Sequence, residues 1–164
     1  MTSRDKRPLD PWTLLGTLER HRVSYVLVGE LAAVIHGGGG IADQVEISPS
    51  LKPENVARLR TALAELAGEH VAVDAEALVD GECPIVETPA GDVTIIAAPV
   101  GSRGYDDLRR AATREPIGQG VRPNVASLAD LIRLADASND PVLEARAATL
   151  RQVAEIGLEL GIEL

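Results

Sequence analysis

The residues best suited to chemistry lie in one stretch of the sequence. An apolar run, Tyr25–Val28, ends at Gly29 and is followed by Glu30, where a helix is expected to begin. A glycine turn that opens a helix presents free backbone N–H groups and the positive end of the helix dipole, which suit an anion such as a phosphate. The next strand carries Gln44 and Glu46, and this spacing places both side chains on one face. The pattern predicts a phosphate-binding turn that faces a pair of potential metal ligands.

The order of these features resembles that of the nucleotidyltransferase-fold proteins of the DNA polymerase beta superfamily, in the branch that includes bacterial toxin-like and antibiotic-modifying nucleotidyltransferases. In that family a strand ends in Gly-Gly or Gly-Ser, a helix follows, the next strand carries Asp-x-Asp, and a later strand supplies a third Asp. The resemblance runs from a helix near Trp12 to a helix after Ser127. It implies a single α/β (α+β) domain over residues 1–164, with a mixed β-sheet flanked by helices.

The motif positions depart from the family pattern. Gln44 and Glu46 stand where Asp-x-Asp is expected, and the later Asp-x-Asp-like pair reads Asp92 and Thr94. The resemblance therefore assigns these four residues to degenerate catalytic positions. It assigns nucleotide-contacting positions to three further residues: Gly29, Glu30 and Gly40, the last standing where a basic residue is often found.

The substitutions matter because nucleotidyl transfer uses a divalent metal, usually Mg²⁺, held by hard oxygen ligands that bridge to the nucleotide phosphates. Gln44 offers a neutral carbonyl and Thr94 a hydroxyl, so of the three expected acids only Glu46 remains in position. One carboxylate makes a weak magnesium site. We therefore expect no cofactor and a family fold whose metal-dependent catalysis is lost or altered.

The alternative is a rearranged site in which another acid replaces the missing ones. Asp43 is adjacent to Gln44 and is expected to face the opposite side of the strand. Glu30, directly after the turn, is the better substitute, so an active enzyme would hold Mg²⁺ and a nucleoside triphosphate with Glu46, Glu30 and Asp92.

Composition favours one cytosolic globular domain. The 164 residues are 45% hydrophobic but only 2% aromatic, with no Phe, so the core must be built from Val, Leu, Ile and Ala. The single cysteine, Cys83, excludes an internal disulfide. No apolar run is long enough to cross a bilayer, and the first residues lack the apolar segment of a signal peptide, so a cytoplasmic protein with no membrane contact is expected.

The net charge of −9 is unevenly distributed. Residues 42–92 carry eleven acids against Lys52, Arg58 and Arg60, a net charge of −8. Such a surface repels nucleic acid, so general DNA or RNA binding is not expected. A small cationic ligand or a basic protein is easier to accommodate, and the simpler alternative is a solvated, solubilising face.

The sequence predicts three helices and one strand before and beside the candidate site. Asp10 and Pro11 predict a helix that ends near His21, with Trp12 as a core anchor. A covered strand spans 24–28, and a helix from Glu30 ends at His36. Pro53 opens a helix closed by Gly68. The four glycines at 37–40 predict either a mobile loop or a close approach of the backbone to another group.

The second half of the chain is expected to complete a sheet of about five strands. The expected elements are a strand near 71–73, a hairpin of 85–88 and 93–97 with Asp92 as a turn residue, a helix within 101–115, a hairpin over 115–125, a helix capped by Ser127, and a last helix over 141–164. The arginines of 101–115 are expected to contact a triphosphate or to pair with Asp106 and Asp107. Residues 1–9 are expected to form a flexible N-terminus.

Three functions follow from these patterns. The first is a non-catalytic nucleotidyltransferase-like protein, or pseudoenzyme, that binds a nucleotide or a protein partner, for example in a toxin–antitoxin pair. The second is an active nucleotidyltransferase with an atypical acid set. The third is a structural module that acts as a homo-oligomer.

Overall fold

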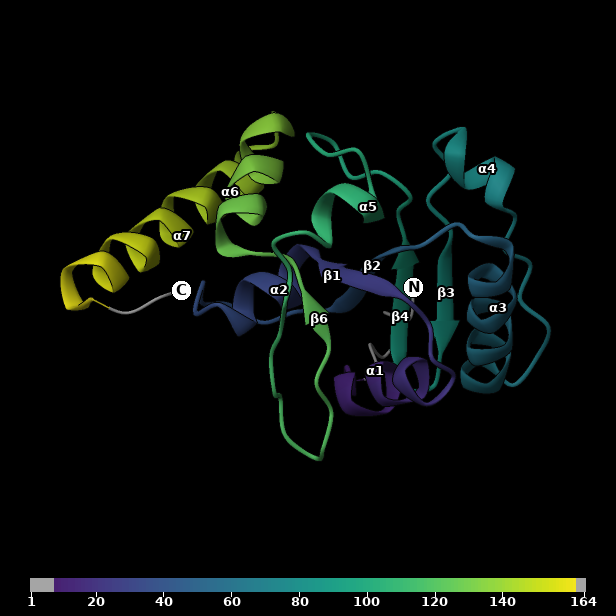
Figure 1. Cartoon of the computed structure of the whole chain (residues 1–164). Coiled ribbons are helices and arrows are strands. Elements are labelled where there is room, and N and C mark those ends of the chain that lie inside the picture. Colours follow the sequence, from purple (N-terminus) through teal and green to yellow (C-terminus); the bar gives the residue numbers. More distant parts are fainter. Residues whose placement is uncertain (1–7, 162–164) are drawn as a thin grey trace, which may run out of the picture.

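The computed structural model describes residues 8–161, which form a six-stranded mixed sheet with helices around it (Figure 1). The strand order is β3-β4-β2-β1-β6-β5. The strands are β1 (Tyr25–Val28), β2 (Gln44–Pro49), β3 (Ile85–Thr88), β4 (Gly91–Ile95), β5 (Thr113–Arg114) and β6 (Asn124–Val125). β2 runs antiparallel to β1 and parallel to β4, while β6 runs parallel to β1. The described part of the chain thus has a single α/β arrangement with a mixed sheet, with one strand more than the sequence suggested.

Seven helices flank the sheet in the described residues: α1 (Pro11–Arg20), α2 (Gly29–Ile35), α3 (Pro53–Ala67), α4 (Ala75–Val79), α5 (Tyr105–Leu108), α6 (Leu128–Ala137) and α7 (Pro141–Leu160). α1 and α3 contact each other and the β3–β4 side of the sheet, and α5 contacts β1. α6 packs against α2 and α7, and Figure 1 shows α7 extending away from the sheet. None of the helices between residues 8 and 161 has the length and apolar character needed to cross a membrane.

The core is aliphatic, as the composition predicts. Leu14, Leu27, Ile47, Leu63 and Ile95 are among its fully buried side chains. Burial of each aliphatic side chain contributes about 1.5–3 kcal/mol to stability, so many buried aliphatic side chains can stabilise the core without phenylalanine. The core can therefore position the central strands without large aromatic residues.

Local capping signals in the sequence are confirmed. The Asp10 side chain accepts a hydrogen bond from the backbone N–H of Thr13 at 3.0 Å, and Ser127 accepts one from Asp130 at 3.0 Å. Gly68 ends α3 with a φ of 77°, the left-handed conformation that glycine adopts without steric cost. These contacts fix where α1, α6 and α3 begin or end.

The strand predicted near 71–73 is wrong. The chain has no regular structure there and then forms α4. Arg60 Nε donates to the carbonyl of Val73 at 2.6 Å, so this backbone is satisfied by a side chain of α3 instead of a neighbouring strand. The apolar alternation reflects burial of Val73 against the core, which requires no sheet pairing.

Trp12 is not the core anchor that the helical spacing predicted. It is 37% exposed, and its Nε1 donates to the carbonyl of Ile117 at 2.7 Å. The indole needs a hydrogen-bond acceptor, and it finds one on the β5–β6 hairpin, while Leu14, Leu15 and Leu18 fill the core.

Three other boundaries differ. Leu9, assigned to a flexible N-terminus, packs against the core, while residues 1–7 and 162–164 lie outside the described part. The sequence favours a strand that ends at Ile47, whereas β2 continues two residues further, to Pro49. α5 has only four residues, so Arg109, Arg110 and Arg114 follow the helix instead of lying on it. The expected pairing of Arg109 with Asp106 is present at 3.2 Å.

Candidate functional site

The candidate residues of β2 and β4 lie side by side on the sheet. The parallel register pairs Gln44 with Asp92 and Glu46 with Thr94. Asp92 is therefore a strand residue, and its assignment to a turn is wrong, because β4 begins at Gly91 directly after the tight hairpin connection. Residues two apart on a strand share a face, so all four side chains can approach one another.

A short hydrogen-bonded chain joins three of these residues. The Thr94 hydroxyl donates to Gln44 Oε1 at 2.5 Å, and Gln44 Nε2 donates to Glu46 Oε1 at 3.5 Å. Thr94 is buried and the other two are partly buried. The neutral amide and hydroxyl thus satisfy each other and extend one contact to the remaining carboxylate.

The Glu46 carboxylate packs against the turn at Gly29. Gly29 has a φ of +74°, and a Cβ there would lie 1.3 Å from Glu46 Oε2. The backbone N–H of Glu30, at the start of α2, donates a hydrogen bond to the same carboxylate. The anion at this turn is therefore the protein's own Glu46, and any side chain at position 29 would force this carboxylate to move.

Burial raises the pKa of Glu46 above its ordinary value, and the nearby negative charge of Glu30 adds to this effect. The hydrogen bond from the Glu30 backbone and the positive charge of Arg146 act in the opposite direction. The carboxylate is thus partly desolvated, and its charge is offset by groups of this chain.

Arg146 is a site residue that sequence reasoning missed. It lies on α7, and its Nη2 is 3.6 Å from Glu30 Oε1, while Glu30 Oε2 accepts from the backbone N–H of Asp43 at 3.3 Å. The Arg146 side chain is only 20% exposed. The sequence does contain a pattern that could have identified it: Arg146 lies between Leu143 and Ala147, on the side of α7 that faces the protein.

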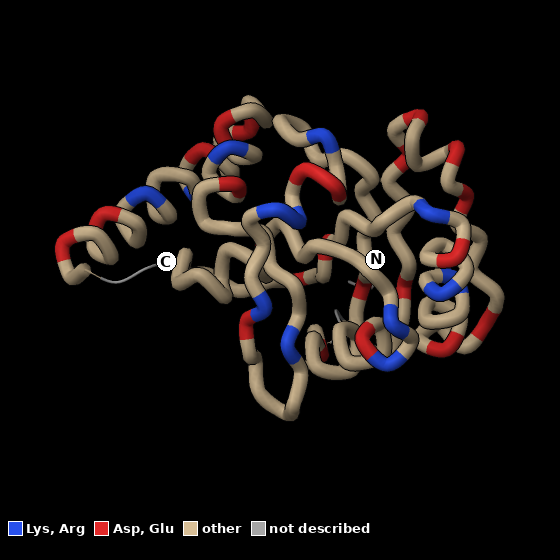
Figure 2. Tube along the Cα trace, in the orientation of Figure 1, with Lys and Arg blue, Asp and Glu red and all other residues tan. Residues whose placement is uncertain are grey.

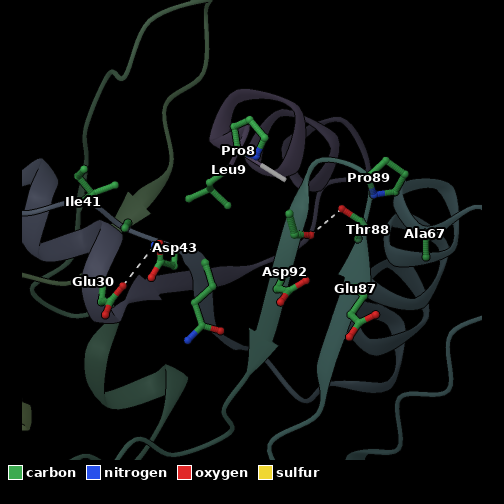
Figure 3. Close-up of a pocket in the computed structure, with 13 residues that line it drawn as sticks. Pro8, Leu9, Glu30, Ile41, Asp43, Ala67, Glu87, Thr88, Pro89 and Asp92 are labelled. Carbon is green, nitrogen blue, oxygen red and sulfur yellow. Dashed lines mark hydrogen bonds between the residues drawn. The ribbon is translucent and has the colours of Figure 1, made fainter. Parts of the chain in front are cut away.

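A cavity of about 1060 Å³ opens beside these residues (Figure 3). Figure 3 shows Glu30 and Asp43 on one side, and Asp92 of β4 and Glu87 of β3 on the other. The described residues that line it include no lysine or arginine; they are Pro8, Leu9, Glu30, Ile41, Ala42, Asp43, Gln44, Ala67, Glu87, Thr88, Pro89, Gly91 and Asp92. The lining is therefore strongly acidic.

Gly40 is not among the residues that line the cavity, although its neighbour Ile41 is. Of the four glycines, Gly38 is the tightly packed one: a Cβ there would lie 2.9 Å from the carbonyl oxygen of Ala33 and 3.0 Å from Leu150 Cδ2. The close approach thus joins the end of α2 to α7. His36, at the end of α2, contacts the carbonyl of Ala126 through Nε2 at 2.8 Å, which is a structural contact.

Of the four motif positions, only Glu46 and Asp92 carry carboxylates, the ligands that Mg²⁺ prefers. Magnesium requires several hard oxygen ligands in near-octahedral geometry. Glu46 supplies the only carboxylate of the three-residue chain, and its oxygens already contact Gln44 and the Gly29 turn. Between residues 8 and 161, no three His, Cys, Asp or Glu side chains lie close enough together to hold a metal ion.

Comparisons with known proteins support the fold. No protein-family model and no curated protein sequence matches the chain. Among solved structures, the chain is similar to the solution structure of the antibiotic-resistance factor ANT(2'')-Ia, an aminoglycoside nucleotidyltransferase, with a TM-score of 0.52 and 14% sequence identity. The match covers 90% of this chain and 82% of that one. At this identity, the similarity establishes the nucleotidyltransferase-like fold and leaves activity to be argued from the site.

Proposed function

We propose that this nucleotidyltransferase-fold protein acts by binding a ligand, without metal-dependent nucleotidyl transfer. The main support is the hydrogen-bonded chain of Thr94, Gln44 and Glu46 against the Gly29 turn. A triphosphate would need the turn's N–H groups, and a metal would need the Glu46 oxygens. The backbone N–H of Glu30 and the Glu46 carboxylate already bond to each other, and releasing them would leave partly buried polar groups unsatisfied, at a cost of about 1–3 kcal/mol each.

The cavity favours a small ligand with positive charge. Its volume of about 1060 Å³ lies at the upper end of small-molecule sites, which span about 300–1000 Å³. The carboxylates of Glu30 and Asp92 line the cavity from opposite sides, and negative charge there favours cations over phosphates. The similarity to an antibiotic-resistance factor supports a small molecule as the ligand, with a basic protein segment or a nucleotide as alternatives.

Calorimetry tests this function. We expect a polycationic aminoglycoside to bind in the cavity, and we expect Mg²⁺ to add nothing to the binding of ATP, GTP, CTP or UTP. Asp92→Asn removes one cavity charge and should weaken aminoglycoside binding, whereas Asp106→Asn, on the surface beside Arg109, should leave it unchanged. Magnesium-dependent release of pyrophosphate, abolished in Glu46→Ala, would refute the proposal.

An active nucleotidyltransferase with an atypical acid set is the second candidate. The observation that favours it is the proximity of Glu30 to Glu46, which is close enough to raise the pKa of the Glu46 carboxyl. Asp92 stands beside Gln44 in the adjacent strand. This function predicts equal loss of nucleotide turnover in Glu30→Gln, Glu46→Gln and Asp92→Asn, which a radiolabelled transfer assay measures.

A further inference from the structure

A second cavity, of about 440 Å³, lies at the opposite end of β1 from the acidic one. Tyr25, the first residue of β1, contributes to its wall. Arg22 comes from the turn after α1, Arg114 from β5, and Arg122 from the loop before β6. The sheet order β1-β6-β5 brings these distant segments together, and Figure 2 shows basic segments on both arms of the β5–β6 hairpin.

The lining of this cavity is positively charged. It contains three arginines and one acid, Glu19. Glu19 Oε1 accepts a hydrogen bond from the backbone N–H of Arg122 at 2.8 Å, so this carboxylate holds the hairpin against α1. Arg114 Nη2 donates to the Arg122 carbonyl at 3.2 Å. The guanidinium groups of Arg22 and Arg122 make no ion pair with any residue between 8 and 161, which leaves their charge available to a ligand.

The Tyr25 hydroxyl is the observation that points to a ligand. Tyr25 is only 4% exposed, and its hydroxyl makes no hydrogen bond with any other described residue. Buried hydroxyl groups almost always have a partner, because an unsatisfied one costs about 1–3 kcal/mol. Burial raises the pKa of Tyr25, so the group remains a neutral O–H donor at physiological pH.

We propose that this cavity binds a small phosphorylated molecule through its phosphate monoester group, with arginines 22, 114 and 122 neutralising the charge and Tyr25 donating a hydrogen bond. Arginine is the side chain best suited to phosphate, because its planar group donates two parallel hydrogen bonds. A phosphate monoester carries close to two negative charges at neutral pH, which matches the net charge of the lining. The phosphate also accepts from Ser24 and Asn124, which line the same cavity.

The size and charge of the surroundings favour a small molecule over a nucleic acid chain. The cavity is in the lower part of the range for small-molecule sites. A polynucleotide would extend over the acidic surface of residues 42–92, whose net charge is −8, and would be repelled. Tyr105 offers an apolar ring beside the phosphate position for the organic part of the ligand.

Calorimetric titration of the full chain with inorganic phosphate, ribose 5-phosphate and AMP tests this site, with ribose and adenosine as unphosphorylated controls. We expect the two monoesters to bind and the controls not to bind. Arg22→Gly is the most informative variant, because Arg22 has a φ of 59° and glycine adopts this conformation without strain. It should keep or raise the Tm while weakening monoester binding about ten-fold or more.

Two further variants separate the site from its surroundings. Tyr25→Phe should retain the fold and weaken binding about ten-fold, because one hydrogen bond to a charged ligand is lost. Arg109→Ala removes an arginine outside the cavity, so it should bind the monoesters normally. Absence of binding at millimolar concentrations, or binding that Arg22→Gly and Tyr25→Phe leave unchanged, would overturn the proposal. The outcome is independent of whether the acidic cavity binds its ligand.

Discussion

The two ends of β1 differ in how their polar groups are satisfied. After Val28, hydrogen bonds link the backbone N–H of Glu30 to Glu46, Glu46 to Gln44, and Gln44 to Thr94, and the adjacent cavity is acidic. Before Val26, the Tyr25 hydroxyl has no partner among the described residues, and the adjacent cavity is basic. At the Val28 end, which resembles an enzyme site, the polar groups are bonded within the protein. At the Tyr25 end, the buried hydroxyl has no acceptor among the described residues. Whether a site can bind a ligand therefore has to be judged from its polar groups without partners, and motif position alone does not decide it.

The largest loss of stability is expected for Gly29→Ala, at the Val28 end of β1. The new methyl group would overlap the Glu46 carboxylate and would sit at a positive φ, so stability should fall by about 2–4 kcal/mol in urea denaturation. Gly68→Ala is the matched control, since Gly68 has a similar φ of +77° and no atom within 4 Å of a Cβ. It should lose only about 1 kcal/mol. Equal losses in the two variants would mean that Glu46 does not occupy the turn.

Thr94→Val should give the next largest loss. It keeps the shape of the buried side chain but removes the donor to Gln44 Oε1, so an acceptor loses its partner at a cost of about 1–2 kcal/mol. Thr61→Val, whose hydroxyl donates only to the exposed α3 carbonyl of Ala57, is the control and should change little. A neutral result for Thr94→Val, again from urea denaturation, would argue that the chain of hydrogen bonds contributes nothing.

Tyr25→Phe should have the opposite sign. Removing an unsatisfied buried hydroxyl leaves the packing intact and relieves its desolvation cost, so the unliganded protein should gain up to about 1 kcal/mol. Together with Thr94→Val, this variant tests the contrast between the two ends of β1 directly. A loss of stability in Tyr25→Phe would show that the hydroxyl already has a partner in solution.

The smallest effect is a pH dependence at Glu46. Because the folded protein raises the pKa of this carboxyl above 4.5, the unfolded chain releases the proton first, and stability falls as the pH rises through the interval above 4.5. Below 4.5 the group is protonated in both states and contributes no slope. Glu46→Gln lacks this titration, so its stability relative to the parent should increase from pH 4 toward neutrality. A constant difference in Tm across this range would contradict the burial of the charge.

Several elements of the fold followed from short-range patterns. The cap at Asp10 and the glycine at the end of α3 appear where the sequence indicated, and the β3–β4 hairpin is present with β4 beginning two residues earlier, at Gly91. These features depend on residues within a few positions of one another, so the local sequence contains the necessary information. The strand predicted near 71–73 failed because apolar alternation reports burial, and burial there required no partner strand.

The sequence by itself determined which residue types stand at the motif positions, and hence that a single carboxylate, Glu46, remains among the three expected acids. Only the tertiary structure decided what Glu46 contacts, that Arg146 of α7 reaches Glu30, and that three arginines line one cavity with Tyr25. The reason is physical: spacing along one strand or helix fixes which side chains share a face, whereas contacts between distant segments depend on how the sheet is ordered and how the helices pack on it.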